Sequence, residues 1–232
     1  MQLFYAPDIS RKPELPEEES RHATRVLRLS EGDMITVTDG KGFFYRAAIS
    51  AISGKRTLLT IQETIPQEKL WKGHIHIGMA PTKNMDRTEW LTEKATEIGF
   101  DELSFLLCRF SERKVIKTER VHKIAVSAMK QSLKARLPDI HEMIGFGKFI
   151  KQKFPEQKFI AHCYEGDKPL LKDVIQPGKD AVILIGPEGD FSEEEVRLAI
   201  ENGFRPVSLG KSRLRTETAA LVATHILNIC NQ

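Results

Sequence analysis

The feature that most constrains the fold is a regular alternation of short apolar segments and amphipathic segments from Gly73 to the C-terminus. The apolar segments have the length of strands, and they occupy residues 74–80, 102–108, 158–164, 181–185 and 206–209. The segments with helical periodicity occupy residues 86–99, 118–135, 192–203 and 216–230. This order predicts an α/β domain in which helices cover a largely parallel sheet.

The first seventy residues follow a different pattern, rich in strands. Residues 34–52 alternate in polarity around the turn DGKG, which predicts a hairpin, and residues 56–65 supply another strand rich in β-branched residues. A single helix is predicted from Glu17 to about Arg28. A small β-barrel with one helix fits this pattern. We therefore expect two domains, residues 1–70 and residues 73–232, joined by a polar connector.

The composition argues against a disulfide framework, a metal site and a membrane span. The 232 residues include three cysteines, Cys108, Cys163 and Cys230, whose odd number and wide spacing argue against a disulfide framework. The seven histidines and three cysteines show no metal-ligand spacing, so we predict no metal. The N-terminus has no apolar signal segment, and no stretch approaches the roughly 18 apolar residues of a membrane span. A cytoplasmic location is expected.

Two loops stand where a ligand binds in open α/β sheets, at the carboxyl ends of predicted strands. The first loop, GPEGD, matches neither the dinucleotide fingerprint nor the P-loop. It precedes Ser192, a predicted N-cap that forms a capping box with Glu195, and an acidic first helical turn that would repel a pyrophosphate. The ligand predicted here carries no phosphate, and S-adenosylmethionine satisfies that condition. A tight turn with no ligand is the alternative.

The second loop, LGKSRLRTETA, carries three cations, Lys211, Arg213 and Arg215, directly before the last predicted helix. Thr216 or Thr218 is expected to cap that helix. Cations at a helix N-terminus oppose the helix dipole, so helix stability gives no reason for them. They are predicted to be functional.

A basic segment from Arg109 to Arg136, which covers the loop and helix of the second strand–helix unit, is the predicted RNA contact. The residues expected to contact phosphates are Arg109, Arg113, Lys130, Lys134 and Arg136. A solvated helix face is the alternative for this segment. In the first domain, KGFFYR either contacts RNA or forms an ordinary hairpin face.

The motifs GPEGDFSEEE, LGKSRLRTETA, TEKATEIGF and KQSLKARLP, with HATRVLRLSEGD and TVTDGKG in the first domain, resemble the bacterial RsmE family in order and spacing. Members of that family are 16S ribosomal RNA uridine-N3 methyltransferases of the SPOUT class. The resemblance implies a PUA-like barrel, an α/β domain with a trefoil knot that holds S-adenosylmethionine, and a homodimer acting on 16S rRNA or the small ribosomal subunit. The residues expected to bind the cofactor are Gly186, Pro187, Glu188, Gly189, Leu209, Gly210, Leu214 and Thr216.

Two positions depart from the family pattern. Asp190 stands where the family usually has a second glycine, and Ser212-Arg213 stand where it usually has arginine and an aliphatic residue. Aspartate tolerates a positive φ better than most residues. The sequence leaves two possibilities for Arg213. Its side chain supplies the guanidinium of the family's arginine, or that guanidinium has no replacement in this chain.

Methylation of uridine N3 requires a weakly acidic imide to lose its proton. Arg215 is the residue expected to stabilise the resulting negative charge on the uracil. Glu217 or Glu188 could accept the proton, but Glu217 also suits a first-turn dipole partner and Glu188 a turn residue. Two other functions remain open: ribose 2′-O methylation of RNA, and RNA binding by a dimer without catalysis.

Overall fold

The computed structural model describes residues 2–154 and 157–232, and the chain forms two compact units. The first unit comprises Met1–Lys69 with Val126–Leu137, and the second comprises Leu70–Ala125 with Pro138–Gln232. No helix of the described residues is long and apolar enough to cross a membrane.

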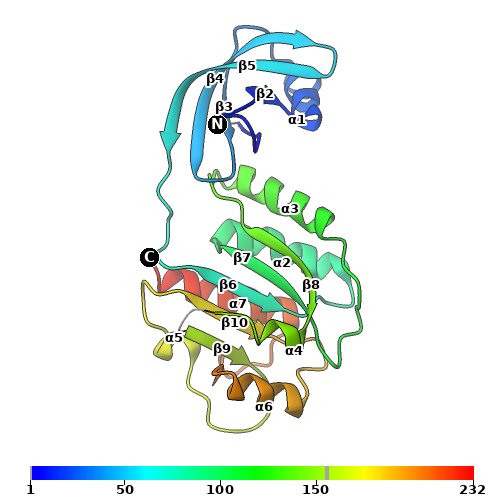
Figure 1. Cartoon of the computed structure of the whole chain (residues 1–232), viewed down its shortest axis with the longest axis vertical. Helices are drawn as coiled ribbons and strands as arrows, with labels where there is room; N and C mark the ends of the chain where they lie inside the picture. The colour runs from blue at the N-terminus through cyan, green and yellow to red at the C-terminus, as the bar shows by residue number, and fades with distance from the viewer. Residues whose placement is uncertain (1, 155–156) are drawn as a thin grey trace. The chain divides into compact units, whose positions relative to one another are not determined.

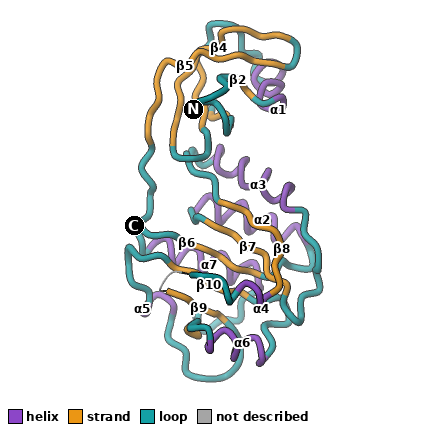
Figure 2. Tube along the Cα trace, in the orientation of Figure 1, coloured by secondary structure: helices purple, strands orange, loops and turns teal. Residues whose placement is uncertain are grey.

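The first unit contains a five-stranded sheet with the order β1-β3-β4-β5-β2. Its strands are β1 (Leu3–Tyr5), β2 (Glu14–Leu15), β3 (Met34–Thr38), β4 (Phe43–Ser53) and β5 (Arg56–Pro66). The predicted hairpin around residues 39–42 is confirmed, because β3 and β4 pair antiparallel on either side of that turn. Strands β4 and β5 form a second, longer hairpin (Figure 2). The short strands β1 and β2 were not predicted.

The predicted helix of the first unit is also present. It begins as α1 (Glu17–Arg21) and continues as one π-helical segment, η1 (His22–Val26). The chain leaves the helix through Arg28, whose φ of 56° lies in the left-handed region. The helix therefore ends two residues before the predicted end.

The second unit contains a six-stranded sheet with the order β11-β9-β10-β6-β7-β8, and every pairing in it is parallel. Its strands are β6 (Ile75–Met79), β7 (Glu102–Leu107), β8 (Asp139–Gly145), β9 (Gln157–Ala161), β10 (Ala181–Ile185) and β11 (Arg205–Val207). The predicted parallel sheet is confirmed. Strand β8 was missed, because this edge strand has no buried residue and so lacks the apolar run of a central strand.

Helices cover both faces of this sheet. They are α2 (Met85–Ile98), α3 (Thr118–Gln131), α4 (Phe146–Phe149), α5 (Leu171–Val174), α6 (Glu193–Glu201) and α7 (Thr216–Ile229). Helices α2, α5 and α7 pack with one set of strand side chains, and α4 and α6 pack with the other set. Figure 1 shows α2 and α7 together behind the sheet. The two layers of helix leave the strand ends open to loops.

Helix α3 ends at Gln131, four residues before the predicted end at position 135. The next residues form a Schellman motif, in which Leu133 N–H donates to the Lys130 carbonyl at 3.2 Å and Lys134 N–H donates to the Met129 carbonyl at 3.0 Å. Leu133 adopts a φ of 54°, a conformation in which glycine is usual. Because no glycine marks the end of this helix in the sequence, the predicted helix extended four residues too far, toward Pro138.

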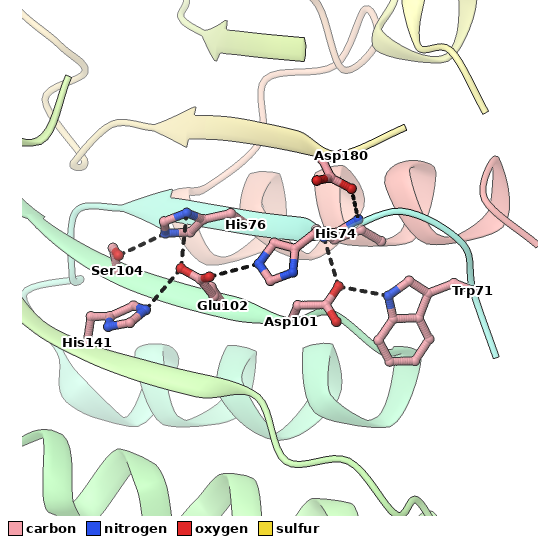
Figure 3. Close-up of polar contacts among 9 residues, drawn as sticks. Trp71, His74, His76, Asp101, Glu102, Ser104, His141 and Asp180 are labelled. Atoms are coloured by element: carbon pink, nitrogen blue, oxygen red, sulfur yellow. Dashed lines mark hydrogen bonds and ion pairs between the residues drawn. The ribbon is translucent and has the colours of Figure 1, made fainter. Parts of the chain in front are cut away.

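A polar cluster of three histidines surrounds Glu102 at the amino-terminal edge of the six-stranded sheet (Figure 3). The Glu102 carboxylate lies 2.8 Å from Nε2 of His74, 3.0 Å from Nε2 of His141 and 3.4 Å from Nδ1 of His76. Burial lowers the pKa of His76 to about 4. The hydrogen bond from His74 lowers the pKa of Glu102 to about 2, despite partial burial.

Candidate active site

A cleft of about 410 Å³ opens at the carboxyl ends of β9 and β10. Its volume lies in the range of sites for small molecules and cofactors. Three segments form its walls: the end of β9, the turn after β10, and the loop that leads into α7. It is lined by Arg87, Ala161, Cys163, Ile185, Gly186, Pro187, Glu188, Gly189, Asp190, Arg213, Leu214, Arg215, Thr216 and Ala219.

A second pocket, of about 470 Å³, is lined by residues that follow β9, by the end of β11 and by the first part of the loop before α7. The two pockets share Ala161, Cys163, Arg213, Leu214 and Ala219, so they adjoin. Every residue predicted to bind the cofactor lines at least one of them. Gly186, Pro187, Glu188, Gly189, Leu214 and Thr216 line the first pocket, and Leu209, Gly210 and Leu214 line the second.

Asp190 holds the turn after β10 in shape. Its φ is 65°, so the residue adopts the conformation for which glycine is usual. Its N–H donates to the carbonyl of Pro187 at 2.9 Å, and its carboxylate accepts from Cys163 N–H at 2.7 Å and from Phe191 N–H at 2.8 Å. The aspartate thus adopts the backbone conformation of the usual glycine and ties this turn to the segment after β9.

The structure gives each of the three glycines of these loops a reason within the protein itself. A Cβ at Gly186 would lie 3.0 Å from the backbone nitrogen of Phe191, and a Cβ at Gly189 would lie 3.2 Å from Cβ of Phe110. Both glycines therefore make room for the protein itself. At Gly210 a Cβ would meet nothing within 4 Å, but a φ of 134° disfavours any other residue.

Glu188 links the cleft to the loop after β6. Its carboxylate accepts from Lys83 N–H at 2.8 Å. The guanidinium of Arg113 holds the same loop from another direction, with hydrogen bonds from Nε to the carbonyl of Thr82 at 3.0 Å and from Nη2 to the carbonyl of Lys83 at 2.5 Å. The loop 82–84 is therefore a fixed part of the site.

Helix α7 begins at the cleft, with Arg215 as its N-cap residue. The prediction that Thr216 or Thr218 caps this helix is wrong, because no side chain accepts a hydrogen bond at this cap and Thr216 already lies in the helix. By contrast, the predicted capping box of Ser192 and Glu195 at α6 is confirmed. The exposed guanidinium of Arg215 and a helix N-terminus without a side-chain cap thus lie together on one wall of the cleft.

Glu217, in the first turn of α7, is 7% exposed and does not line the cleft among the described residues. Its Oε1 lies 3.7 Å from Nε of Arg87, which comes from the first turn of α2 and does line the cleft. Its Oε2 is buried without a hydrogen-bond partner among the described residues. The carboxylate is therefore placed to act on Arg87 from behind the lining of the cleft, as far as the described residues show.

Family comparisons identify this architecture. Residues 69–228 match a family described as the RNA methyltransferase domain, and residues 15–62 match the RNA methyltransferase PUA domain. The ribosomal RNA small subunit methyltransferase E of Synechocystis is 31% identical over 97% of this chain and 76% of its own length. The chain belongs to the RsmE family of RNA methyltransferases.

Solved structures of similar proteins agree with this assignment to the RsmE family. A probable rRNA methyltransferase from Porphyromonas gingivalis is 45% identical, with a TM-score of 0.93 and full coverage of both chains. A ribosomal RNA small subunit methyltransferase E from Neisseria gonorrhoeae, solved with bound S-adenosylmethionine, is 29% identical. Its TM-score is 0.83, with 97% of this chain and 95% of that chain covered.

The five predicted RNA contacts of this RsmE-family chain fall into two groups. Arg109 and Arg113 belong to the second unit, whereas Lys130, Lys134 and Arg136 belong to the first. Arg109 and Arg136 are exposed. The guanidinium of Arg113 donates hydrogen bonds to the carbonyls of Thr82 and Lys83. Lys130 forms an ion pair with the largely buried carboxylate of Glu19 at 2.5 Å. The structure thus gives these last two cations internal partners.

Sequence reasoning missed several residues that line the two pockets. Arg87 lies in a helix far from both glycine loops, and no local motif marks it. Cys163 and Lys168 follow β9, which ends at Ala161, so they lie at the carboxyl ends of the strands. The predicted strand ran on to residue 164, and Cys163 was therefore not recognised as a residue of that edge. Within the described residues, no group of side chains forms a metal site.

Proposed function

We propose that this chain transfers the methyl group of S-adenosylmethionine to N3 of a uridine in 16S ribosomal RNA. The observation that carries the proposal is the cleft in which the GPEGD turn, the guanidinium of Arg215 and the start of α7 meet. Membership of the RsmE family and the cofactor bound in the Neisseria gonorrhoeae relative support it.

The residues of the cleft fit S-adenosylmethionine. The walls hold carboxylates at Glu188 and Asp190, which suit a cationic ligand and disfavour a phosphate. Leu209, Leu214 and Ala219 give apolar surface for an adenine ring. When bound, the cofactor supplies an electrophilic methyl group on a sulfonium centre.

Arg215 is the proposed catalytic residue. As N3 of uracil loses its proton, negative charge spreads to the neighbouring carbonyl oxygens. A guanidinium at the cleft wall stabilises that charge, with two donors that can reach two acceptors. The second contribution of the chain is orientation, because a cleft with fixed walls aligns the reacting groups.

Glu217 is proposed as a positioning residue. Of the two roles that the sequence leaves open, burial disfavours direct proton transfer, because a general base must reach the proton that it removes. The contact with Arg87 favours an indirect role, in which the carboxylate keeps a second guanidinium at the cleft. Glu188 is held by Lys83 N–H, which supports its structural role in the turn.

The remaining parts of the proposal come from the family. Residues 1–70 would act as a PUA-like RNA-binding domain and residues 73–232 as the SPOUT domain, with a C-terminal trefoil knot. The active form would be a homodimer in the cytoplasm, with 16S rRNA or the small ribosomal subunit as its partner.

The experiment is methylation with labelled S-adenosylmethionine, using naked 16S rRNA and small subunits that lack the modification. Nucleoside analysis by mass spectrometry is expected to show 3-methyluridine. A 2′-O-methylated nucleoside would contradict the proposal and indicate ribose methylation. Tight RNA binding with no incorporated label and no heat of cofactor binding would indicate a factor that binds RNA without catalysis.

A further inference from the structure

An exposed aromatic side chain, Phe110, lies beside the cleft and is not explained by packing. It is 46% exposed, whereas its neighbours Cys108 and Ser111 are buried. A half-exposed phenylalanine forgoes part of the stabilisation that full burial contributes. The exposed part of the ring is available to a partner outside the chain.

The turn that carries Phe110 is rigid. Ser111 N–H donates to the carbonyl of Cys108 at 3.1 Å, and Cys108 N–H donates to Oγ of Ser111 at 3.0 Å. In addition, Arg109 N–H donates to Oε1 of Glu195, in the first turn of α6, at 2.8 Å. The ring thus stands on a backbone that is fixed on both sides.

The same turn touches the wall of the cleft. Gly189 lines the cleft, and a Cβ added there would lie 3.2 Å from Cβ of Phe110. Phe110 therefore packs against the GPEGD turn from outside, at its rim. The contact between Phe110 and Gly189 holds the ring in this position without a ligand.

The charges near the ring are mixed, because Arg109 precedes it in the chain and the acidic first turn of α6 lies against the same turn. Arg109 is exposed, and its guanidinium has no hydrogen bond or ion pair within residues 2–154 and 157–232. Lys114 and Lys117 are exposed in the same loop. An aromatic ring beside an exposed arginine is an arrangement by which proteins hold single-stranded nucleic acid, with a base stacked on the ring and a phosphate near the cation.

We propose that Phe110 is the stacking platform for the target uracil. The inference rests on the proposed function and deepens it, because it names the group that receives the base. An enzyme that modifies a base edge must take the base out of its stack, and a ring at the rim of the cleft replaces part of the lost stacking. Arg109 would hold the phosphate next to that base.

The first test separates stacking from apolar contact. Phe110→Ala and Phe110→Leu are both expected to lower kcat/KM for RNA by about 5- to 100-fold, the range for loss of one base-stacking contact, with unchanged cofactor affinity and melting temperature. Phe110→Trp is expected to keep near wild-type kcat/KM. The control is Val115→Ala, which removes a 73% exposed apolar side chain from the same loop and should change nothing.

The second test needs no turnover. RNA that contains 5-bromouridine in place of uridine is irradiated with the protein and S-adenosylhomocysteine, and the digest is examined by mass spectrometry. Trypsin cleaves after Arg109 and Arg113, so a crosslink at the ring is expected on the peptide of residues 110–113. The crosslink should be lost in Phe110→Leu.

Several outcomes overturn the inference. Full activity of Phe110→Ala, or recovery of activity by Phe110→Leu, would exclude stacking. Loss of cofactor binding in Phe110→Ala would show that the ring supports only the GPEGD turn. Failure of the proposed function looks different, because the wild-type protein would then give no 3-methyluridine at all.

Discussion

The carboxylate of Glu217 lies with its Oε1 3.7 Å from Nε of Arg87, and its other oxygen is buried without a hydrogen-bond partner among the described residues. A buried charge with one weakly placed counterion depends strongly on that counterion. The pair joins the first turn of α7 to the first turn of α2. A change in the charge of Glu217 would therefore alter the position of the Arg87 side chain at the cleft.

A double-mutant cycle tests this coupling. Arg87→Met should lower the free energy of unfolding by about 1–3 kcal/mol, because it leaves a buried carboxylate without its cation. Glu217→Gln should cost less, since the amide keeps the shape without the charge. In the double variant most of the loss should be recovered, as measured by urea unfolding. Additive losses would show that the two residues do not interact.

Loss of the guanidinium at position 215 should affect chemistry and leave binding intact. Arg215→Ala is expected to lower single-turnover methylation by roughly a hundredfold, as for an oxyanion-hole donor, while cofactor affinity stays near wild type. Higher pH should recover part of the rate, because it supplies some of the N3 ionisation. Arg215→Lys should recover some activity, because the charge remains without the planar fork.

The control for position 215 is Arg205→Ala, which removes an exposed arginine of β11 that lines neither pocket among the described residues. Its methylation rate should equal that of the wild type. A wild-type rate in Arg215→Ala would make this arginine dispensable and leave the catalytic group to be found among the other cations of the cleft.

Substitutions at Asp190 should separate backbone conformation from hydrogen bonding. Asp190→Gly allows the φ of 65° but removes the bonds to Cys163 and Phe191, whereas Asp190→Ala removes the bonds and adds strain. Alanine should therefore lower the free energy of unfolding by about 1 kcal/mol more than glycine. Equal losses would show that the left-handed conformation carries no cost here.

Acid should destabilise the second unit through the histidine cluster. The pKa of His76 is about 4 in the folded protein and near 6.5 when unfolded, so the unfolded chain binds the extra proton between these values. Stability contributed by neutral His76 is complete above pH 6.5 and is lost as pH falls toward 4. Glu102, with its pKa lowered to about 2, adds a further loss below about pH 4.5.

Measured by urea unfolding, the free energy of unfolding should fall by about 2 kcal/mol between pH 7 and pH 5 because of His76. His76→Gln should remove most of this pH dependence, whatever its effect on stability at pH 7. His225→Gln changes an exposed histidine of α7 and should leave the dependence intact. A slope that persists in His76→Gln would place the acid sensitivity elsewhere.

The cations predicted to contact RNA should divide into two classes. Arg109→Gln should reduce the slope of log affinity against log salt by about 0.7 to 0.9, since one phosphate contact is lost. Lys130→Met should instead lower the free energy of unfolding, by about 2 kcal/mol, because Glu19 is largely buried. If the slope of log affinity against log salt is unchanged in Arg109→Gln, Arg109 is an ordinary exposed cation that does not contact RNA.

The sequence predicted those parts of the fold that local periodicity controls. The buried central strand β10 has a continuous apolar run, and the capping box at Ser192 is a local motif. Strand β8 and the end of α3 were not predictable in this way. The first depends on pairing with β7 at a sheet edge, and the second on a left-handed leucine where glycine is usual.

The candidate site also has parts that local sequence predicted and parts that depend on tertiary contacts. Its two loops were visible as motifs because glycines and cations stand at fixed places between predicted elements. Arg87 and Phe110 were not, because each reaches the cleft through tertiary contacts, with Glu217 and with Gly189 respectively. Burial of Glu217 was equally hidden, since a glutamate in a first helical turn is ordinarily exposed.

The hydrogen bonds of Asp190 to Cys163 and of Glu188 to Lys83 have a consequence for ligand affinity. They join the exits of three neighbouring strands, β6, β9 and β10, into a single frame around the cleft. A frame of this kind has little backbone freedom left to lose when a ligand enters, so the ordering cost that normally subtracts from binding free energy is small. Part of the cofactor affinity of this protein is therefore built in before the cofactor arrives, by two carboxylates that accept hydrogen bonds from backbone N–H groups of their own chain.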